Sequence, residues 1–308
     1  MTKVFIDGSA GTTGLKILGR LGERRDIELI RLSEELRKDT HARTDAMNAS
    51  DVVFLCLPDA AALEAAELGE NPATVVIDTS TVHRTASGWA YGFPELAGRR
   101  ETIAASKRIA NPGCHASGFI ALVAPLVEQG VVAPDAHLSA FSLTGYSGGG
   151  KSMIAQYEQG ERDALLDAPR QYALGQSHKH LPEMAAQCGL ASAPVFCPIV
   201  APYFAGMEVT VPLFRSDIAC GAEEIKAIYR NYYSGGMVHF TEAADEKGFL
   251  SAGVFAGRDD MEITVGGNDE RILLISRFDN LGKGACGAAI QNMNLVLGCD
   301  EREGLVVG

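Results

Sequence analysis

The clearest chemical feature of the chain is residues 111–118, where Cys114 follows a Pro-Gly turn and precedes an apolar run at residues 119–126. The turn and the spacing of that run predict a helix that begins at or within one residue of Cys114. Unpaired N–H groups and the positive end of the helix dipole favour an anion there, and cysteines at helix N-termini have a lowered pKa. The thiolate is the nucleophilic form, so Cys114 is a candidate nucleophile. The alternative is a small buried core residue.

A second chemical cluster contains His178 and His180, which flank a lysine and are followed by Pro182 at the start of a predicted helix. A histidine titrates near neutral pH and can exchange a proton with groups reacting at a cysteine. Three interpretations stay open: a base for Cys114, a metal site shared with a cysteine, or a solvated structural pair. No third metal ligand is evident, so we predict no metal. We expect His115 to point away from this chemistry and to be structural.

The chain opens with a short buried strand at residues 4–6, a glycine-rich turn at 8–14, and helical spacing from residue 15. Glycine lets the backbone approach a pyrophosphate, which then sits on the helix N-terminus. This order of elements predicts a dinucleotide-binding loop. The residues predicted to contact the cofactor there are Gly8, Ser9, Gly11, Thr12, Thr13 and Gly14.

The residue after the second strand of such a fold contacts the adenosine ribose. An acid there selects NAD, whereas a hydroxyl or basic group accommodates the 2′-phosphate of NADP. Ser33 follows the predicted strand at 27–32, and Arg37 lies close by, although Glu34 and Glu35 point the other way. We predict NADP(H) as the cofactor, with Ser33 and Arg37 at its 2′-phosphate.

Strand and helix alternate over the first 114 residues, which predicts an α/β, doubly wound Rossmann-type sheet. Strands are predicted at residues 4–6, 27–32, 51–57 and 75–77. Arg84 follows the last of these, where ligands bind, and is either an anion-binding group or a solvated charge. Later segments alternate with period 2 and predict a second α+β domain with a mostly antiparallel sheet. These segments are residues 138–143, 207–213 and 271–278, and a final helix follows at 284–297.

Residues 145–152 match both the P-loop of NTPases and the nucleophile elbow of hydrolases. A P-loop NTPase needs a later strand that ends in a magnesium-binding Asp, but the apolar run at residues 272–275 is followed by Ser276, and Asp279 lies further along. The elbow needs a helix directly after the serine, and three consecutive glycines start a helix poorly. We instead expect a flexible loop that holds an anionic group through Ser147, Gly148 and Lys151.

The composition of the 308-residue chain is that of a soluble globular protein, with 46% hydrophobic and 21% charged residues. A net charge of −12 argues against a nucleic-acid or anionic-membrane partner but permits a local pocket for a small anionic substrate. Seven cysteines without a C-x-x-C pair suggest neither a zinc knuckle nor a disulfide framework. With no visible signal peptide or membrane span, we expect a cytoplasmic protein.

Considered together, these motifs give the chain a family resemblance. It resembles the N-acetyl-γ-glutamyl-phosphate reductases, in particular their short form, and is similar more broadly to the aspartate-semialdehyde dehydrogenase superfamily. The motifs that carry the resemblance run through the chain in order. They are residues 8–14, 78–84, 91–96, 111–118, 147–151, 178–183, 206–211 and 279–294.

The resemblance implies Cys114 as the nucleophile and His180, in preference to His178, as the base. His178 and Arg84 would then contact the anionic substrate, and the turn that begins at Asn280 would fold onto the cofactor. It implies a dinucleotide-binding domain at residues 1–114 plus 285–308, and a catalytic and oligomerisation domain at 115–284.

The implied reaction is NADPH-dependent reduction of N-acetyl-glutamyl 5-phosphate to the 5-semialdehyde, with release of inorganic phosphate, through a cysteine thioester. It belongs to arginine biosynthesis. The implied assembly is a homodimer or homotetramer built through the second domain's sheet. A related acyl-phosphate reductase, acting on aspartyl phosphate or on a carrier-linked amino acid, is the alternative.

Overall fold

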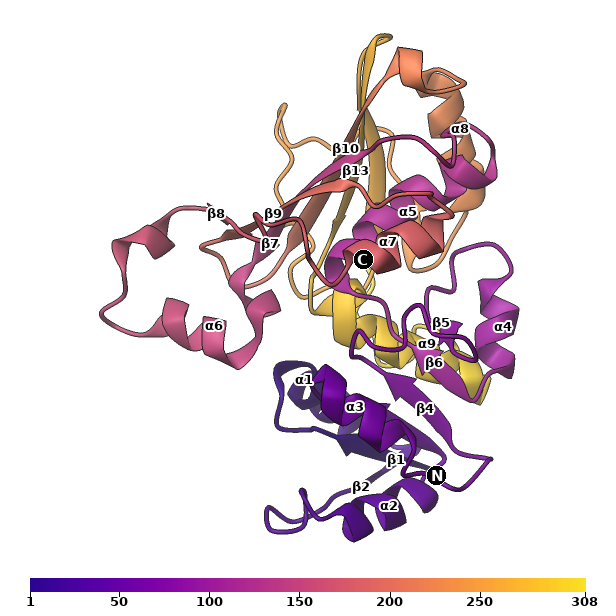
Figure 1. Cartoon of the computed structure of the whole chain (residues 1–308), viewed down its shortest axis with the longest axis vertical. Coiled ribbons are helices and arrows are strands. Elements are labelled where there is room, and N and C mark those ends of the chain that lie inside the picture. Colours follow the sequence, from indigo (N-terminus) through magenta and orange to yellow (C-terminus); the bar gives the residue numbers. More distant parts are fainter. The chain divides into compact units, whose positions relative to one another are not determined.

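The computed structural model describes all 308 residues (Figure 1). The chain divides into two compact units, each built from segments that are not contiguous in sequence. The first comprises Met1–Pro112 and Ala285–Leu305, and the second comprises Gly113–Gly284 and Val306–Gly308. None of the helices has the length and apolar character that a membrane crossing requires.

The first unit contains a six-stranded, fully parallel sheet in the order β2-β1-β3-β4-β6-β5. Every residue of β3 and β4 is buried, as expected for parallel strands that are covered on both faces. The strands are β1 Thr2–Asp7, β2 Ile27–Ile30, β3 Val52–Leu55, β4 Val75–Asp78, β5 Ala90–Tyr91 and β6 Arg108–Ala110. The predicted α/β class is therefore confirmed.

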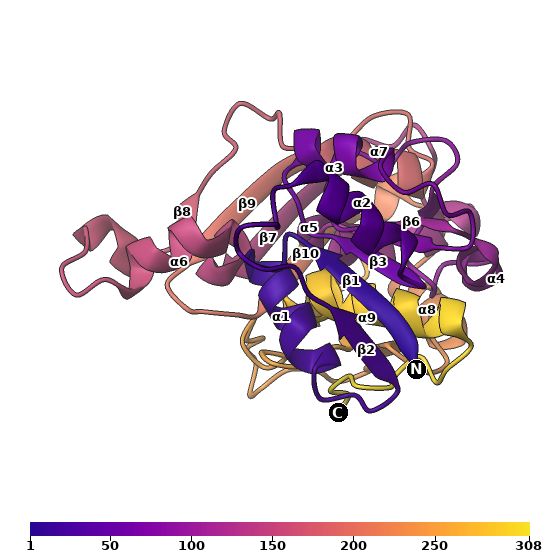
Figure 2. The same ribbon diagram turned by 90° about the horizontal axis from the view of Figure 1, so that it is seen from below.

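Helices cover both faces of this sheet. One apolar cluster packs Ile17 of α1 and Met293 of α9 against one face, and another packs Met47 of α2 and Ala65 of α3 against the other. Figure 2 shows α1 and α9 on one side of β1, and α2 and α3 on the other. The C-terminal helix thus completes a fold begun by the first strand. The helices are α1 Thr12–Leu21, α2 Thr40–Asn48, α3 Asp59–Ala66, α4 Arg99–Ala105 and α9 Gly287–Leu297.

The order of connections determines where this sheet can bind a ligand. The chain leaves β1 through α1 on one face and later reaches β3, on the other side of β1, through α2 on the opposite face. The carboxyl ends of β1 and β3 therefore flank a topological switch point, where open α/β sheets bind ligands. Gly8 lies directly after β1 at this point. The predicted strand at 27–32 is too long, because Ser33 accepts hydrogen bonds from Leu36 and Arg37 in a turn.

The second unit contains a seven-stranded mixed sheet in the order β11-β12-β13-β10-β7-β9-β8. Only the pairs β7/β9 and β11/β12 are parallel, so the mostly antiparallel character predicted from the sequence is confirmed. The strands are β7 Ser139–Gly145, β8 Arg170–Gln171, β9 Val195–Ala201, β10 Met207–Phe214, β11 Val238–Phe240, β12 Met261–Gly267 and β13 Arg271–Phe278.

One face of this sheet carries the helix that begins at Cys114. A Cβ atom at Gly118 would lie 2.5 Å from the Cγ2 of Val209 and 2.8 Å from the Cε1 of Phe278, so α5 packs directly on β10 and β13. α7 packs beside α5, and α8 covers β12. The helices of this unit are α5 Cys114–Glu128, α6 Gly150–Glu158, α7 Leu181–Cys188 and α8 Ala222–Tyr232. Short helical turns occur at Tyr146–Gly149, Ala164–Asp167, Arg215–Asp217 and Gly282–Cys286.

The other face of the second sheet exposes large apolar side chains. Phe214 is 60% exposed, Val195 58%, Phe141 47% and Leu273 38%. These residues come from four different strands, β10, β9, β7 and β13. Monomeric soluble proteins rarely expose contiguous apolar patches of large size, so this face has the character of an association surface.

Candidate active site

Cys114 is the first residue of α5, as the Pro-Gly turn before it predicts. The preceding Gly113 is the N-cap, with extended backbone and no side chain to cap the helix. A turn that begins at Asp279 packs against the cysteine, since a Cβ at Gly284 would lie only 2.9 Å from the Cβ of Cys114. The carboxylate of Asp279 accepts hydrogen bonds from the N–H groups of Leu281 (2.6 Å) and Gly257 (2.6 Å), which stiffens that turn.

The two predicted histidines lie together in the second unit, at the entry to α7. Their ring centroids are 4.7 Å apart, and His180 is the N-cap residue of the helix. The Nδ1 of His178 accepts a hydrogen bond from the backbone N–H of His180 at 3.1 Å. A neutral His178 must therefore carry its proton on Nε2, because a ring nitrogen that accepts a hydrogen bond is not protonated.

His115 joins this cluster instead of pointing away from it. Its ring centroid lies 5.6 Å from that of His178 and 5.7 Å from that of His180. Its two ring nitrogens form 2.7 Å hydrogen bonds with the hydroxyls of Ser142 and Tyr172. Burial, and secondarily the charge of His178, lower the pKa of His115 to about 3, so the ring is neutral at pH 7.

Tyr172 is a member of the cluster that the sequence did not reveal. Burial raises the pKa of its hydroxyl, and the negative charge of Cys114 raises that pKa further. The hydroxyl therefore stays protonated near the nucleophile. Tyr172 belongs to no motif and lies 57 positions from the histidine that it contacts, so only its position in the fold identifies it.

Ser147 and Asn280 lie together in the second unit. The Nδ2 of Asn280 donates to the Oγ of Ser147 at 2.9 Å, and its Oδ1 accepts from the N–H of Gly206 at 3.0 Å. Gly148 lies beside the same side chain, while Lys151 is exposed on α6. Ser147 is only 1% exposed, which is unlike the exposed serine of a nucleophile elbow.

In the first unit, the glycine turn at residues 8–14 leaves no room for a side chain at Gly8 or at Gly14. Gly8 has a φ of +86°, and a Cβ there would lie 2.3 Å from the carbonyl oxygen of Cys56. A Cβ at Gly14 would lie 2.6 Å from the carbonyl oxygen of Gly8. The hydroxyl of Thr12, in the first turn of α1, is buried without a hydrogen-bond partner. A tight backbone cradle with an unsatisfied hydroxyl at a helix N-terminus fits the pyrophosphate of a dinucleotide.

A cavity of about 430 Å³ adjoins this cradle at Gly8 and Ser9. Apolar side chains from α1 and β2 line much of it, which suits an adenine ring. Three cations, Arg31, Arg37 and Lys38, line it with two acids, the buried Asp7, which pairs with Arg43, and the exposed Glu34, which lies 3.1 Å from Arg37. Ser33 does not line it, and its hydroxyl instead lowers the pKa of the neighbouring Glu35 carboxyl. Of the two residues predicted at the 2′-phosphate, only Arg37 reaches the cavity.

Arg84 is buried in the first unit and braces the backbone near the nucleophile's loop. Its Nε donates to the carbonyl of Asn111 at 2.9 Å, and its Nη2 donates to the carbonyl of Thr79 at 3.1 Å. The backbone of Asn111 also donates to the carbonyl of Asp78 at 2.7 Å. Part of the guanidinium thus serves the chain itself, and Arg84 is not a solvated loop charge.

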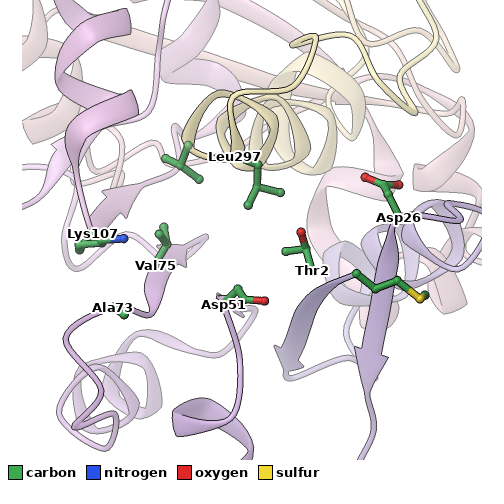
Figure 3. A pocket seen from close by; sticks show the side chains of 9 residues that line it. Thr2, Asp26, Asp51, Ala73, Val75, Lys107 and Leu297 are labelled. Atoms are coloured by element: carbon green, nitrogen blue, oxygen red, sulfur yellow. The ribbon is translucent and has the colours of Figure 1, made fainter.

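A hollow of about 600 Å³ lies at the amino-terminal ends of the strands of the parallel sheet. Figure 3 shows Thr2, Val75 and Leu297 among its lining residues. Its two carboxylates are already engaged. Asp26 pairs with Arg24 at 2.6 Å, and Asp51 accepts the backbone N–H of Lys3 at 2.8 Å. The carboxylates of this hollow therefore have partners, unlike the buried hydroxyl of Thr12 in the glycine cradle.

Comparisons with known proteins agree across the chain. The family model for the dimerisation domain of semialdehyde dehydrogenases matches residues 114–280, and the model for their NAD-binding domain matches residues 33–106. N-acetyl-gamma-glutamyl-phosphate reductase 2 of Nostoc sp. is 43% identical over 320 residues, which cover 98% of this chain and 99% of that protein. N-acetyl-gamma-glutamyl-phosphate reductase of Brucella ovis is 43% identical over 306 residues, which cover 96% and 99%.

Solved structures share the fold at low identity. Aspartate semialdehyde dehydrogenase II of Vibrio cholerae, complexed with ASA, superposes with a TM-score of 0.71 at 17% identity, covering 96% of this chain and 98% of that chain. Aspartate semialdehyde dehydrogenase with NADP from Candida albicans superposes with a TM-score of 0.65 at 16% identity, with the same coverage.

Proposed function

Since the chain belongs to the N-acetyl-gamma-glutamyl-phosphate reductase family, we propose that it reduces N-acetyl-glutamyl 5-phosphate to N-acetyl-glutamate 5-semialdehyde and inorganic phosphate, a step of arginine biosynthesis. Full-length identity of 43% to enzymes of that name supports the reaction. The observation that carries the mechanism is a cysteine at a helix start in the same unit as a buried histidine cluster.

Cys114 is the proposed nucleophile. Its thiolate attacks the carbonyl carbon of the acyl phosphate, and the carbon–oxygen bond to phosphate breaks as its electron pair leaves with the phosphate. The product is a thioester on Cys114. The start of α5 favours the thiolate because the backbone N–H groups of a helix's first turn and its dipole stabilise negative charge. A thiolate is also a good leaving group, which the last step requires.

Reduced nicotinamide, when bound, supplies the hydride that adds to the thioester carbon. His180 is the proposed acid and base. It donates its proton to the oxygen that becomes an alkoxide, which leaves a neutral thiohemiacetal on Cys114. The imidazole then takes the proton back as the carbon–sulfur bond breaks, and this releases the aldehyde and regenerates the thiolate. Because Nδ1 of His178 already accepts a hydrogen bond, His178 suits a positioning or substrate-contact role better.

NADP(H) is the proposed cofactor. The cradle of Gly8, Gly11 and Gly14, with Ser9, Thr12 and Thr13, would hold its pyrophosphate. The cationic lining of the adjoining cavity supports a 2′-phosphate contact through Arg37, together with Arg31 and Lys38. In the second unit, Ser147, Gly148 and Lys151 are proposed to contact the anionic substrate. Asn280, whose amide nitrogen and oxygen each form a hydrogen bond, is proposed to contact the nicotinamide.

We also propose that two copies associate through the exposed apolar face of the second unit's sheet. The family model that matches this unit describes a dimerisation domain. The exposed side chains of Phe141, Val195, Phe214 and Leu273 supply the apolar surface that such an association buries.

The decisive assay is phosphate-dependent reduction of NADP⁺ with N-acetyl-glutamate 5-semialdehyde, run beside the non-acetylated semialdehydes. Activity confined to the N-acetylated substrate is the expected result. Preference for aspartate semialdehyde would instead support the alternative, which only the shared fold favours. Near-normal turnover by Cys114→Ala would exclude the thioester mechanism.

A further inference from the structure

The start of α7 carries a buried carboxylate that the proposed chemistry does not use. His180 is the N-cap of α7, and Glu183 is the third residue of the helix proper. Glu183 is only 1% exposed. Its Oε1 accepts a hydrogen bond from the backbone N–H of Gly113 at 2.8 Å, and Gly113 is the N-cap of the helix that begins with Cys114.

This hydrogen bond is unusual because its donor belongs to a different helix. A glutamate at the third position of a helix commonly reaches back to the N–H of its own N-cap, which the helix leaves without a partner. Here Glu183 instead accepts the N-cap N–H of the neighbouring helix. Pro182 precedes it and has no N–H, so the first turn of α7 has one donor fewer to satisfy. A single carboxylate thus connects two helix starts.

We propose that Glu183 is a positioning residue for the reacting pair: its carboxylate caps α5 from α7 and so holds Cys114 and His180 in register. The assignment of chemical roles to this pair rests on the proposed function, whereas the cross-helix cap does not. Reacting groups must be placed within about 1 Å for full catalytic effect. One hydrogen bond between the first turns of the two helices acts at the place where such control is needed.

Two properties of Glu183 are separable by substitution. Glu183→Gln keeps the length of the side chain and an accepting oxygen but removes the charge. Glu183→Asp keeps the charge but is one methylene shorter, so the cap is out of reach. If reach decides the effect, Gln retains kcat within about threefold of wild type, whereas Asp and Ala each lose roughly 30- to 100-fold. The KM for NADPH stays within about twofold in all three, because the dinucleotide cradle belongs to the first unit.

Glu128 provides matched control variants. It lies at the other end of α5 and accepts a hydrogen bond from the hydroxyl of Tyr232 at 2.9 Å. The same substitutions to Gln, Asp and Ala at Glu128 should leave kcat within about twofold of wild type. Melting temperatures of all variants identify any general loss of folding, and Glu183→Gln keeps the inference testable if Glu183→Ala folds poorly.

A second measurement needs no substrate. Iodoacetamide labels Cys114 at a rate that depends on its thiolate fraction. Mass spectrometry of peptides distinguishes labelling at Cys114 from labelling at the exposed Cys299, which serves as the reference. Because Gln keeps the cap and removes a nearby negative charge, Glu183→Gln should label Cys114 at pH 7 at least as fast as wild type, whereas Glu183→Asp should label severalfold more slowly. This order in a protein without reductase activity would refute the proposed function and still support the cap. The proposed cap would be overturned if Glu183→Gln lost as much kcat as Glu183→Ala while Glu183→Asp kept a normal kcat. It would also be overturned if Glu183→Ala kept the wild-type kcat.

Discussion

Replacing His115 by asparagine should remove much of the acid sensitivity of the second unit. The ring is buried and neutral, and its pKa falls from 6.5 to about 3 on folding. In the unfolded chain the same ring gains a proton near its ordinary pKa. Between these two values the unfolded state binds the additional proton, so the free energy of unfolding must decrease as the pH decreases. Above pH 6.5 the contribution of the neutral ring is complete.

The size of the effect follows from the two pKa values. Each pH unit inside the window costs about 1.4 kcal/mol, so wild type loses about 3 kcal/mol between pH 8 and pH 4.5 through His115 alone. The full window down to pH 3 corresponds to about 5 kcal/mol. Asparagine cannot be protonated, and its amide can still meet the hydroxyl of Ser142, which lies 2.7 Å from the Nδ1 of His115. The variant is less stable than wild type at neutral pH but loses less on acidification.

Urea titrations at several pH values between about 8 and 4.5, followed by hydrogen exchange of peptides from α5, measure this difference in the second unit. The single tryptophan, Trp89, belongs to the first unit, so its fluorescence provides an internal control that His115→Asn should not affect. Parallel losses of stability in wild type and variant from pH 6.5 to 4.5 would show that His115 is not held neutral by burial.

Three further predictions concern the cofactor and the catalytic pair. Gly8→Ala should weaken NADPH binding at least about tenfold in a fluorescence titration, because a Cβ cannot fit at a φ of +86° against the carbonyl of Cys56; unchanged binding would contradict the cradle. His180→Asn should lower kcat by about 10²- to 10⁴-fold and His178→Asn much less, and the reverse order would reassign the base. Arg37→Ala should raise the KM for NADPH about tenfold at low salt and leave that for NADH unchanged; equal changes would exclude a 2′-phosphate contact.

Local patterns predicted the parts of the molecule that local interactions determine. The Pro-Gly turn and the apolar run place the start of α5 at Cys114, and the alternation of strands and helices gives the parallel sheet. His115 was placed wrongly because helical spacing orients a side chain only on its own helix. Its partners Ser142 and Tyr172 come from β7 and from the chain after β8.

The second strand illustrates the same limit at shorter range. Its strand-like pattern continues to Leu32, but pairing with β1 stops at Ile30, and a turn closed on Ser33 begins soon afterwards. Competition between strand pairing and turn formation is decided by the neighbouring strand, which a local pattern does not contain. Ser33 was therefore expected at the cofactor cavity, which it does not line.

The way the chain passes into the second unit after Pro112 and returns at Ala285 has a consequence for how the two units are connected. In the first unit, the Nδ2 of Asn111 donates to the carbonyl of Ala285 at 3.0 Å, so the residues that flank segment 113–284 are neighbours. In the second unit, Gly284 packs against Cys114, so the two ends of segment 113–284 are neighbours too. Nearby ends on both sides are what the insertion of one domain into a loop of another requires.

Residues 113–284 thus have the connectivity of a module inserted between Pro112 and Ala285, and α9, which follows them, packs back on the sheet of the first unit. The same geometry permits circular permutation, since the two ends of the module can be joined. Cys114 therefore lies two residues after Pro112, where the chain passes from the first unit to the second.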